Sequence, residues 1–501
     1  MSLKTWIAKK WANYRYHQIQ KIVNNPIENQ KKLLFHLLKQ AENTDFAQKY
    51  HFSKIKTIKD FQDFVPITDY ESLKPFIEKV YIEGKKNVLW KGIPAYFAKT
   101  SGTTSGTKFI PLSLEMMRCQ VKGARDALLC YIYHSQKPNF LDGKMMFLTG
   151  SPILEKSPSG ILTGRLSGIS NHYVPSYLRT NQVPSYSTNC IEDWELKIQK
   201  IFEEVQNQDL RLISGIPPWV QMFFEYAEKK TGKKPIEIWK NLQIFVQGGV
   251  DFSPYRPIFE KSIGKSVDIV EVFPASEGFI AIQDDYKKND LLLMLDYGIF
   301  YEFVPLEEYG KPNAQRLTLS EVELGVNYAL ILTTNAGLWA YDIGDTIQFS
   351  SLKPFRLRVT GRVKHFLSTF GEHIIQTEVN QAIQYACEKT GAMVHEFTVA
   401  PFVSSESSCH EWFIELEKNP DDYQKFQNFI DEKLQSLNIY YKDLRTGNIL
   451  NKPKIHIVQL STSREYMKSI GKLGGQNKFP RLMNNRKIAD FMLNYVINSI
   501  Q

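Results

Sequence analysis

The chain lacks the marks of several protein classes. Its five cysteines are odd in number, widely spaced and without a C-x-x-C pair, which argues against a disulfide framework or a zinc site. No apolar run approaches the ~18 residues of a membrane span, and the opening residues lack the apolar run of a signal peptide. We therefore expect a cytoplasmic protein with no membrane span.

The chain also lacks a long block of like charges, so it has no basic tail for nucleic acid. Its net charge is +9 over 501 residues, a mild excess that suits an anionic small molecule such as a nucleotide and does not require nucleic acid. With 43% hydrophobic and 23% charged residues, the composition is that of a globular protein. A chain of this length is longer than a single hydrophobic core usually supports, so we expect more than one domain.

The opening segment combines aromatic and basic residues. Trp6, Ile7, Trp11 and Tyr14 alternate with lysines in a stretch that reads as a helix. Such a helix lies on a membrane surface or, more commonly, packs its apolar side on its own domain. We favour packing and expect helices over residues 1–49.

Residues 96–111 read YFAKTSGTTSGTKFIP and contain the most distinctive loop of the chain. Glycines let backbone N–H groups approach an anion, and hydroxyl groups add donors, so the loop after Thr100 predicts a phosphate-binding concavity. Its spacing fits neither a Walker A motif nor a nucleophile elbow. The alternative is a flexible Ser/Thr/Gly linker, which the close apolar flanks and Lys108 make less favoured.

Strands and helices alternate in the following part of the chain. Apolar runs at four places read as strands: residues 144–149, 210–214, 242–246 and 267–273. The alternation predicts an α/β fold with a largely parallel sheet, in which ligands bind beyond the carboxyl ends of strands. We therefore place the loop after Thr100, Gly248 and Gly249, and the segment after Phe273 at the ligand site.

Two regions depart from this alternation. Residues 151–184 are rich in Gly, Ser and Pro and read as irregular, and His172 within them is more commonly structural than catalytic. From Leu291 onward, strands separated by turns predict an antiparallel or barrel-like subdomain.

Two short motifs carry carboxylates. The sequence FPASEG places Glu277 after a predicted strand. There it could hold Mg²⁺ against phosphates or, equally, lie at a helix N-terminus and interact favourably with the helix dipole. The sequence YDIGD places Asp342 and Asp345 around Gly344, and such carboxylates bind sugar hydroxyls or simply belong to a turn.

Two further motifs carry cations. Arg362 follows Gly361 and could bind a phosphate or a ribose hydroxyl, although a surface arginine is commoner. In GKLGGQNKFPR, Lys478 could bring positive charge to a transition state or be a solvated lysine, and Pro480 disfavours a helix there.

The order of these motifs resembles that of adenylate-forming enzymes. Within that superfamily, TSGTTSGTKFIP, FPASEG, YDIGD and QNKFPR are most similar to the bacterial branch of the auxin-responsive acyl acid amido synthetase family. The resemblance runs from DFVPITDYESLKPFI to QNKFPRL, nearly the whole chain. It implies a large N-terminal domain with mostly parallel sheets and a barrel-like β subdomain (residues 1–361), and a small α+β C-terminal lid domain that reorients about a hinge (residues 362–501).

The resemblance also implies a reaction and a set of site residues. A small carboxylic acid reacts with ATP and Mg²⁺ to give an acyl-adenylate, and an amino acid amine then takes the acyl group. Phosphates would be held by Ser101, Gly102, Thr103, Thr104 and Ser105. Ser276 and Glu277 would lie at the phosphate–Mg²⁺ region, Phe273 near the adenine, Asp345 at the ribose, and Arg362 near the hinge. The catalytic residues would be Lys478 and Glu277.

Some assignments stay open. The hinge pivot is Lys364 or His365, and the acyl pocket is expected around His172 and residues 215–219 and 248–251. Tyr441 and Arg445 match a family segment without an assigned role. An acyl-CoA ligase and a catalytically silent nucleotide-binding protein remain alternatives.

Overall fold

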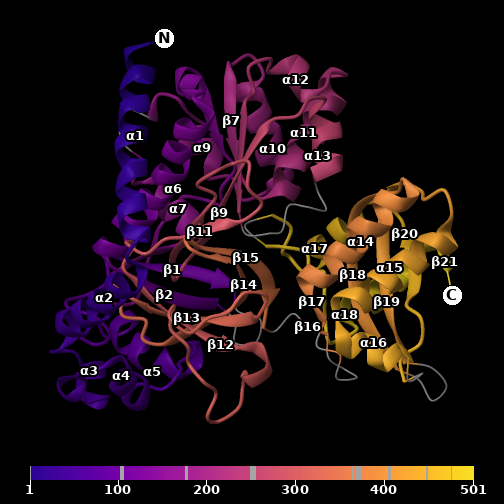
Figure 1. The fold of residues 1–501 in the computed structure, drawn as a ribbon. Helices are drawn as coiled ribbons and strands as arrows, with labels where there is room; N and C mark the ends of the chain where they lie inside the picture. The colour runs from indigo at the N-terminus through magenta and orange to yellow at the C-terminus, as the bar shows by residue number, and fades with distance from the viewer. Residues whose placement is uncertain are drawn as a thin grey trace. The chain divides into compact units, whose positions relative to one another are not determined.

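The computed structural model describes most of the chain in two compact units (Figure 1). The described residues are 2–101, 107–174, 179–248, 256–363, 366–367, 372, 374–403, 408–446, 449–474 and 477–500. The first unit comprises residues 1–249 and 267–358, and the second comprises residues 250–266 and 359–501. Among the described residues, none of the helices has both the length and the apolar composition of a membrane span.

An eleven-stranded sheet forms the centre of the first unit, in the order β12-β13-β14-β15-β11-β10-β9-β8-β7-β3-β6. Its strands are β3 (Lys144–Phe147), β6 (Gln182–Val183), β7 (Leu210–Ser214), β8 (Ile244–Gly248), β9 (Asp268–Ala275), β10 (Gly278–Ile282), β11 (Leu291–Leu293), β12 (Ile299–Pro305), β13 (Asn327–Thr334), β14 (Tyr341–Leu352) and β15 (Phe355–Arg362). From β6 to β9 all pairs are parallel, whereas β9–β10, β10–β11, β11–β15, β12–β13 and β13–β14 are antiparallel. The expected α/β class is confirmed. The strands after Leu291 continue this one mixed sheet and, as far as they are described, do not close into a barrel.

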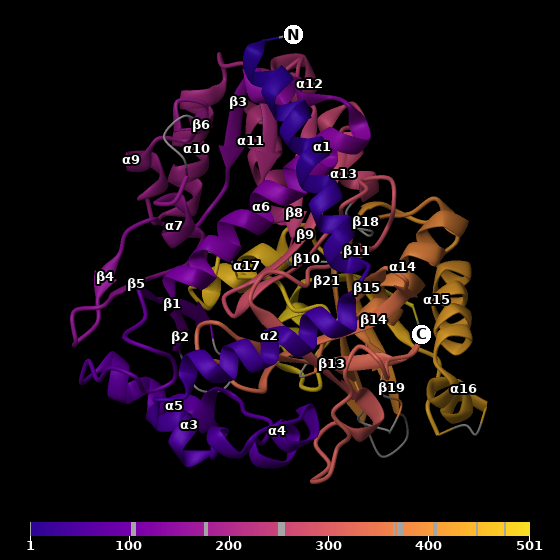
Figure 2. The same ribbon diagram turned by 60° about the vertical axis from the view of Figure 1, so that its left-hand side comes forward.

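Helices pack on this sheet and around it (Figures 1 and 2). They are α1 (Leu3–Val23), α2 (Pro26–Ala41), α3 (Asp45–Lys49), α4 (Ile58–Phe64), α5 (Tyr70–Tyr81), α6 (Leu114–Ser135), α7 (Leu166–Asn171), α9 (Tyr186–Asn189), α10 (Trp194–Val205), α11 (Pro217–Thr231) and α12 (Pro235–Ile238), with 3₁₀ turns η1 (Phe52–Lys54), η2 (Pro138–Asp142) and η3 (Leu306–Glu308). Helix α6 contacts β9 and β10 on one side and α1 on the other. Ser113 starts α6 by accepting a hydrogen bond from the Met116 N–H at 2.9 Å.

A separate four-stranded sheet in the first unit corrects one expectation. Its order is β2-β1-β5-β4, with β1 (Tyr96–Ser101), β2 (Thr107–Leu112), β4 (Glu155–Lys156) and β5 (Leu162–Gly164). Strands β1 and β2 pair antiparallel from Tyr96↔Leu112 to Ser101↔Thr107. The strands that flank the Ser/Thr/Gly loop therefore form a hairpin in this separate sheet, and the strand before the loop does not belong to the parallel sheet. Residues 151–184, expected to be irregular, contribute β4, β5, α7 and β6.

The second unit is a four-stranded sheet, β18-β19-β20-β21, with helices on both faces. Its elements are α13 (Arg256–Ile263), β16 (Phe366–Leu367), β17 (Ile374–Ile375), α14 (Gln376–Thr390), β18 (Met393–Val403), β19 (Ser408–Lys418), α15 (Tyr423–Leu437), α16 (Ile439–Thr446), β20 (Lys454–Val458), α17 (Thr462–Ser469), α18 (Lys487–Met492), η4 (Leu493–Tyr495) and β21 (Val496–Ile500). Side chains alternate across this sheet, because Trp412 and Ile414 join the core with α14 and α15, whereas Phe413 joins the core with α18.

Candidate functional site

The hairpin β1–β2 is held in place by Tyr70. The Tyr70 hydroxyl accepts a hydrogen bond from the Phe109 N–H at 3.0 Å, and the Lys108 ammonium lies 5.5 Å from the centre of the Tyr70 ring. Ser101 ends β1 at the start of the loop. The predicted phosphate binders Gly102, Thr103, Thr104 and Ser105 lie outside the described residues.

The residue two positions before α5, Thr68, contacts the YDIGD motif. Thr68 forms an isolated parallel bridge with Tyr341. Its N–H donates to the Ala340 carbonyl at 2.9 Å, and its own carbonyl accepts from the Asp342 N–H at 2.8 Å. Asp69 then caps α5, so Tyr70 follows at once. Thr68 thus contacts β14, and Tyr70, two residues later, contacts the hairpin.

Glu277 lies in a tight hairpin turn. Ala275 at the end of β9 pairs with Gly278 at the start of β10, so Ser276 and Glu277 are the two turn residues. No helix begins at this turn, so Glu277 is not an N-terminal acid that interacts with a helix dipole. The Gln120 amide on α6 donates to the Ala275 carbonyl at 2.8 Å and fixes the end of β9.

Tyr341 marks the place where these segments meet. Burial raises the pKa of Tyr341 well above its usual range, and the negative charges of Glu277, Asp342 and Asp69 raise it further. The charges of the β9–β10 turn, of β14 and of the N-cap of α5 therefore all act on one buried tyrosine. This links two of the predicted motif regions in the first unit, FPASEG and YDIGD.

The YDIGD motif is a bulge within β14. On β13, Ala329 pairs with Thr346 and Ile331 with Asp342, so three residues of β14 oppose one residue of β13. Gly344 has a φ of +77°, a conformation that glycine adopts without a steric penalty. The motif was expected to form a turn, and the long-range pairing makes it part of a strand.

Asp342 has a structural role in the bulge. Asp342 accepts hydrogen bonds from the Tyr309 hydroxyl on one oxygen and from the Gly344 N–H, at 2.7 Å, on the other. Burial raises the pKa of Asp342, and the nearby charge of Asp345 acts in the same direction, against these two hydrogen bonds. Asp342 therefore closes the bulge.

Two other predicted residues have a clear packing role. A Cβ on Gly248 would lie 2.4 Å from the Val272 carbonyl oxygen, so only glycine allows β8 to approach β9 this closely. Phe273 lies in β9 and is buried. Gly249 lies outside the described residues.

Arg362 and Lys478 belong to the second unit. Arg362 is exposed at the end of β15, where the Thr377 hydroxyl donates to the neighbouring Thr360 carbonyl at 2.7 Å. Lys478 is exposed in a segment with no helix or strand over described residues 471–474 and 477–481, as Pro480 predicts. Lys364 and His365, the candidate pivots, lie outside the described residues.

Arg481, which the sequence did not single out, anchors the segment that carries Lys478. Its guanidinium is buried, pairs with Glu396 at 2.7 Å and lies 4.9 Å from the centre of the Phe397 ring. Its carbonyl accepts from the Val399 N–H at 2.9 Å. The chain is thus fixed three residues after Lys478. In the sequence, the signal for this anchor is an arginine that directly follows two apolar residues, Phe479 and Pro480.

Tyr441 and Arg445 have a structural role. The buried Tyr441 hydroxyl donates to Asp431 at 2.6 Å, and the Arg445 guanidinium pairs with both oxygens of Asp431 at 2.9 Å. Arg445 also donates to the Leu450 carbonyl at 2.8 Å. These bonds fasten α16 to α15. Thr68, Tyr70 and Arg481 are the residues that sequence reasoning missed.

The expected acyl-pocket segments are only partly described. His172 lies with Nε2 3.0 Å from the Pro152 carbonyl, so its ring is held by the backbone. Trp219 is buried and its ring centre lies 4.7 Å from that of Trp194. Val250 and Asp251 lie outside the described residues.

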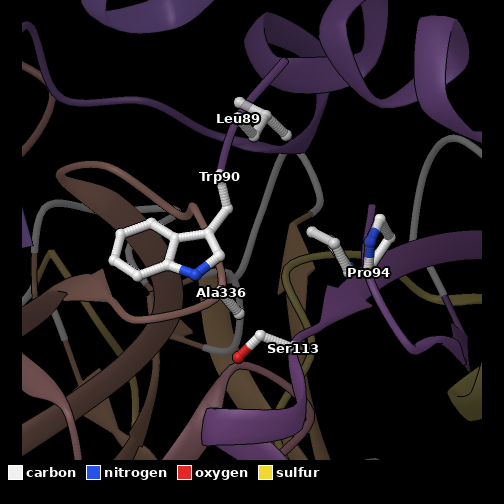
Figure 3. Close-up of a pocket in the computed structure, with 6 residues that line it drawn as sticks. Leu89, Trp90, Pro94, Ser113 and Ala336 are labelled. Carbon is white, nitrogen blue, oxygen red and sulfur yellow. The ribbon is translucent and has the colours of Figure 1, made fainter. Parts of the chain in front are cut away.

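A small pocket lies beside the end of β2 (Figure 3). It is lined by Leu89, Trp90, Pro94, Pro111, Ser113 and Ala336 and has a volume of about 20 Å³. That volume holds about one water molecule, which is far too small for a nucleotide or an acyl group. In the part of the chain that is described, no cluster of three or more His, Cys, Asp or Glu side chains could hold a metal ion by itself.

Three sequence models of one family match the chain. The GH3 family N-terminal domain matches residues 15–216, the central domain matches residues 292–362, and the C-terminal domain matches residues 377–487. Together they span well over half of the chain.

Curated proteins and solved structures of the same family are similar over nearly the whole chain. Indole-3-acetic acid-amido synthetase GH3.4 of Arabidopsis thaliana is 22% identical over 96% of this chain and 93% of its own length. GH3.8 of Oryza sativa subsp. indica is 20% identical over 96% and 92%. The structure of AtGH3.15 acyl acid amido synthetase in complex with 2,4-DB superimposes with a TM-score of 0.79 at 16% identity, covering 98% of this chain and 97% of that chain. A 2-hydroxyisobutyryl-CoA ligase reaches a TM-score of 0.55 at 13% identity, covering 96% and 90%.

Proposed function

The chain belongs to the GH3 family, and from this membership we infer that it is a ligase that joins a carboxylic acid to an amino acid through an acyl-adenylate. The acid's carboxylate oxygen attacks the α-phosphorus of ATP, and pyrophosphate leaves. The amine nitrogen then attacks the acyl carbon, an amide bond forms, and AMP leaves with the electron pair of the broken C–O bond. The observation that carries this inference is the meeting of the β1–β2 hairpin, the Glu277 turn and the β14 bulge around Tyr70 and Tyr341.

The first unit would hold the nucleotide. Residues 101–105 would bind phosphates through their backbone N–H groups and hydroxyls. Asp345 would accept hydrogen bonds from the ribose hydroxyls, as the order of the motifs implies. Phe273 would lie near the adenine, and Gly248 and Gly249 would border the site.

Mg²⁺ fits a site of this kind. It is commonly held by one or two carboxylates together with substrate phosphates, and it does not need a cage made only of protein. Glu277, with Ser276 beside it in the half-buried turn between β9 and β10, would offer such a carboxylate to the phosphates. When bound, the ion would offset the charge of the phosphates.

The second unit would complete the site. The acid and the triphosphate repel each other as anions, and Lys478 would reduce this repulsion and stabilise charge in the transition state. Arg362 would support the nucleotide near the hinge. In this proposal residues 1–361 act as the adenylation domain, residues 362–501 act as a lid that reorients between the two half-reactions, and the enzyme works in the cytoplasm.

The test is pyrophosphate release from Mg-ATP with pooled carboxylic acids, followed by product analysis with amino acids or CoA as acceptor. Lys478→Ala should lower adenylation by about 10²–10³-fold. Lys472→Ala is the matched control, because Lys472 is an exposed lysine of the same segment and should leave the rate unchanged.

Each outcome discriminates among functions. An amide product dependent on amino acids supports the proposal, whereas a thioester with CoA and no amide identifies an acyl-CoA ligase. If no acid supports ATP cleavage while AMP still raises the melting temperature, the chain is a silent nucleotide-binding protein. Equal rates for wild type and Lys478→Ala refute the role of Lys478.

A further inference from the structure

Helix α1 presents two different faces. The buried face is made of Thr5, Ala8, Ala12, Arg15, Ile19 and Val23. Its small residues let α1 pack closely on α6, with which it shares a hydrophobic core. The packing expected for this helix therefore uses one side of it only.

The opposite face of α1 is apolar and aromatic over its first half. The exposed large side chains are Leu3, Trp6, Ile7, Trp11 and Tyr14. Leu3 is 73% exposed, Tyr14 62%, Ile7 50% and Trp6 49%. In Figure 2 the helix lies on the near side of its unit, with no other element of that unit drawn across it. Single exposed apolar residues are ordinary, but five within four turns form a patch.

The charged side chains of the helix itself have one sign. The helix contains Lys4, Lys9, Lys10, Arg15 and Lys21 and has no aspartate or glutamate. Arg15 is neutralised by Asp126 at 2.7 Å, and Lys4 donates to the Leu141 carbonyl. Lys9, Lys10 and Lys21 form no ion pair within the described residues. Asp142, which accepts from Ser2 at 2.8 Å, is the acid that lies at the start of the helix.

We propose that this face of α1 docks on an anionic lipid surface. Helices that lie in the membrane interface combine Trp and aliphatic residues on one side with lysines at its border, and Trp and Tyr rings favour the headgroup level. Lysine stems lie along the apolar surface while the ammonium groups reach anionic headgroups. The Lys10 ammonium already lies 5.9 Å from the centre of the Trp6 ring, so charge and aromatic surface are contiguous.

A second copy of the chain fits this face less well than lipid does. In a symmetric dimer the same surface meets itself, so the lysines of one helix would face those of the other with no acid on either helix. An anionic bilayer instead supplies both the apolar medium and the opposite charge.

Co-flotation of the full chain with vesicles tests the proposal. We expect binding to phosphatidylcholine vesicles that contain phosphatidylglycerol, weaker binding to phosphatidylcholine alone, and loss of binding at high salt. Reversal of charge in Lys9→Glu and Lys10→Glu should each lower the partition coefficient at least about fivefold. The double variant Trp6→Ser with Ile7→Ser should remove binding.

Matched substitutions elsewhere in the first unit provide the controls. Leu324→Ser removes an equally exposed apolar side chain, and Lys74→Glu reverses an exposed lysine on α5; both should bind as the wild type does. All variants should keep vesicle-free adenylation, which shows that they are folded. The proposal is overturned if the wild type stays in solution with anionic vesicles or if the α1 variants float as the controls do. A concentration-dependent dimer in sedimentation that the double variant abolishes also overturns it, because a second copy would then cover this face.

Discussion

Asp342 and Asp345 lie three residues apart in one bulge. We expect substitution of Asp342 to lower stability and substitution of Asp345 to weaken the binding of ATP. Asp342→Ala removes the acceptor of the Tyr309 hydroxyl and of the Gly344 N–H. Each such donor left without a partner costs about 1–3 kcal/mol. The charge of Asp342 is itself unfavourable beside Asp345 and Asp69, so its removal offsets part of this loss of stability. We therefore expect a net loss of about 2–4 kcal/mol in the free energy of unfolding.

Asp342→Asn separates the hydrogen bonds from the charge. Its amide oxygen still accepts from the Gly344 N–H, and its NH₂ group donates to the Tyr309 oxygen, so we expect a loss below about 1 kcal/mol. The folded state raises the pKa of Asp342 above 3.8. It therefore binds this proton more tightly than the unfolded state does, and the contribution to stability falls as pH rises from 3.8 through the raised pKa. The Asn variant should lose this part of the pH dependence.

Asp345→Asn is the functional counterpart. We expect it to raise the KM for ATP about tenfold or more, because a neutral amide binds ribose hydroxyls less strongly. Urea unfolding followed by circular dichroism, over a series of pH values, and pyrophosphate-release kinetics measure both effects. The assignment fails if Asp342→Ala is as stable as the wild type, or if Asp345→Asn has a normal KM for ATP.

Two further substitutions test the hairpin anchor and a buried acid. Tyr70→Phe leaves the Phe109 N–H without its acceptor while keeping the ring, so it should cost about 1–2 kcal/mol and raise the KM for ATP; a normal KM would show that the hairpin does not depend on this bond. Burial raises the pKa of Glu378 from 4.5 to about 7, so the stability present at low pH should fall by about 3 kcal/mol as pH rises through this window. Glu378→Gln should flatten that fall, whereas Glu388→Gln, an exposed acid of the same helix, should not; equal pH profiles for both variants would refute the assignment.

The sequence alone determined the elements that depend on local patterns. Helical spacing and capping residues fix α5 and α6, whose N-caps are Asp69 and Ser113. Short apolar runs after turns give the parallel strands β7 and β8. The ordered motifs also identified the family, because a motif is a local property of the chain.

Only the tertiary structure decided how the motifs are built. Strands β1 and β2 pair as a hairpin, Glu277 lies in a two-residue turn and Gly344 lies in a bulge. Each of these depends on the register between strands, which no local pattern encodes. Contacts between elements likewise assigned Arg445 to Asp431 and Tyr309 to Asp342. The chemistry of the site could be read in its residue types, whereas their arrangement arises from contacts between segments hundreds of residues apart, such as Thr68 with Tyr341.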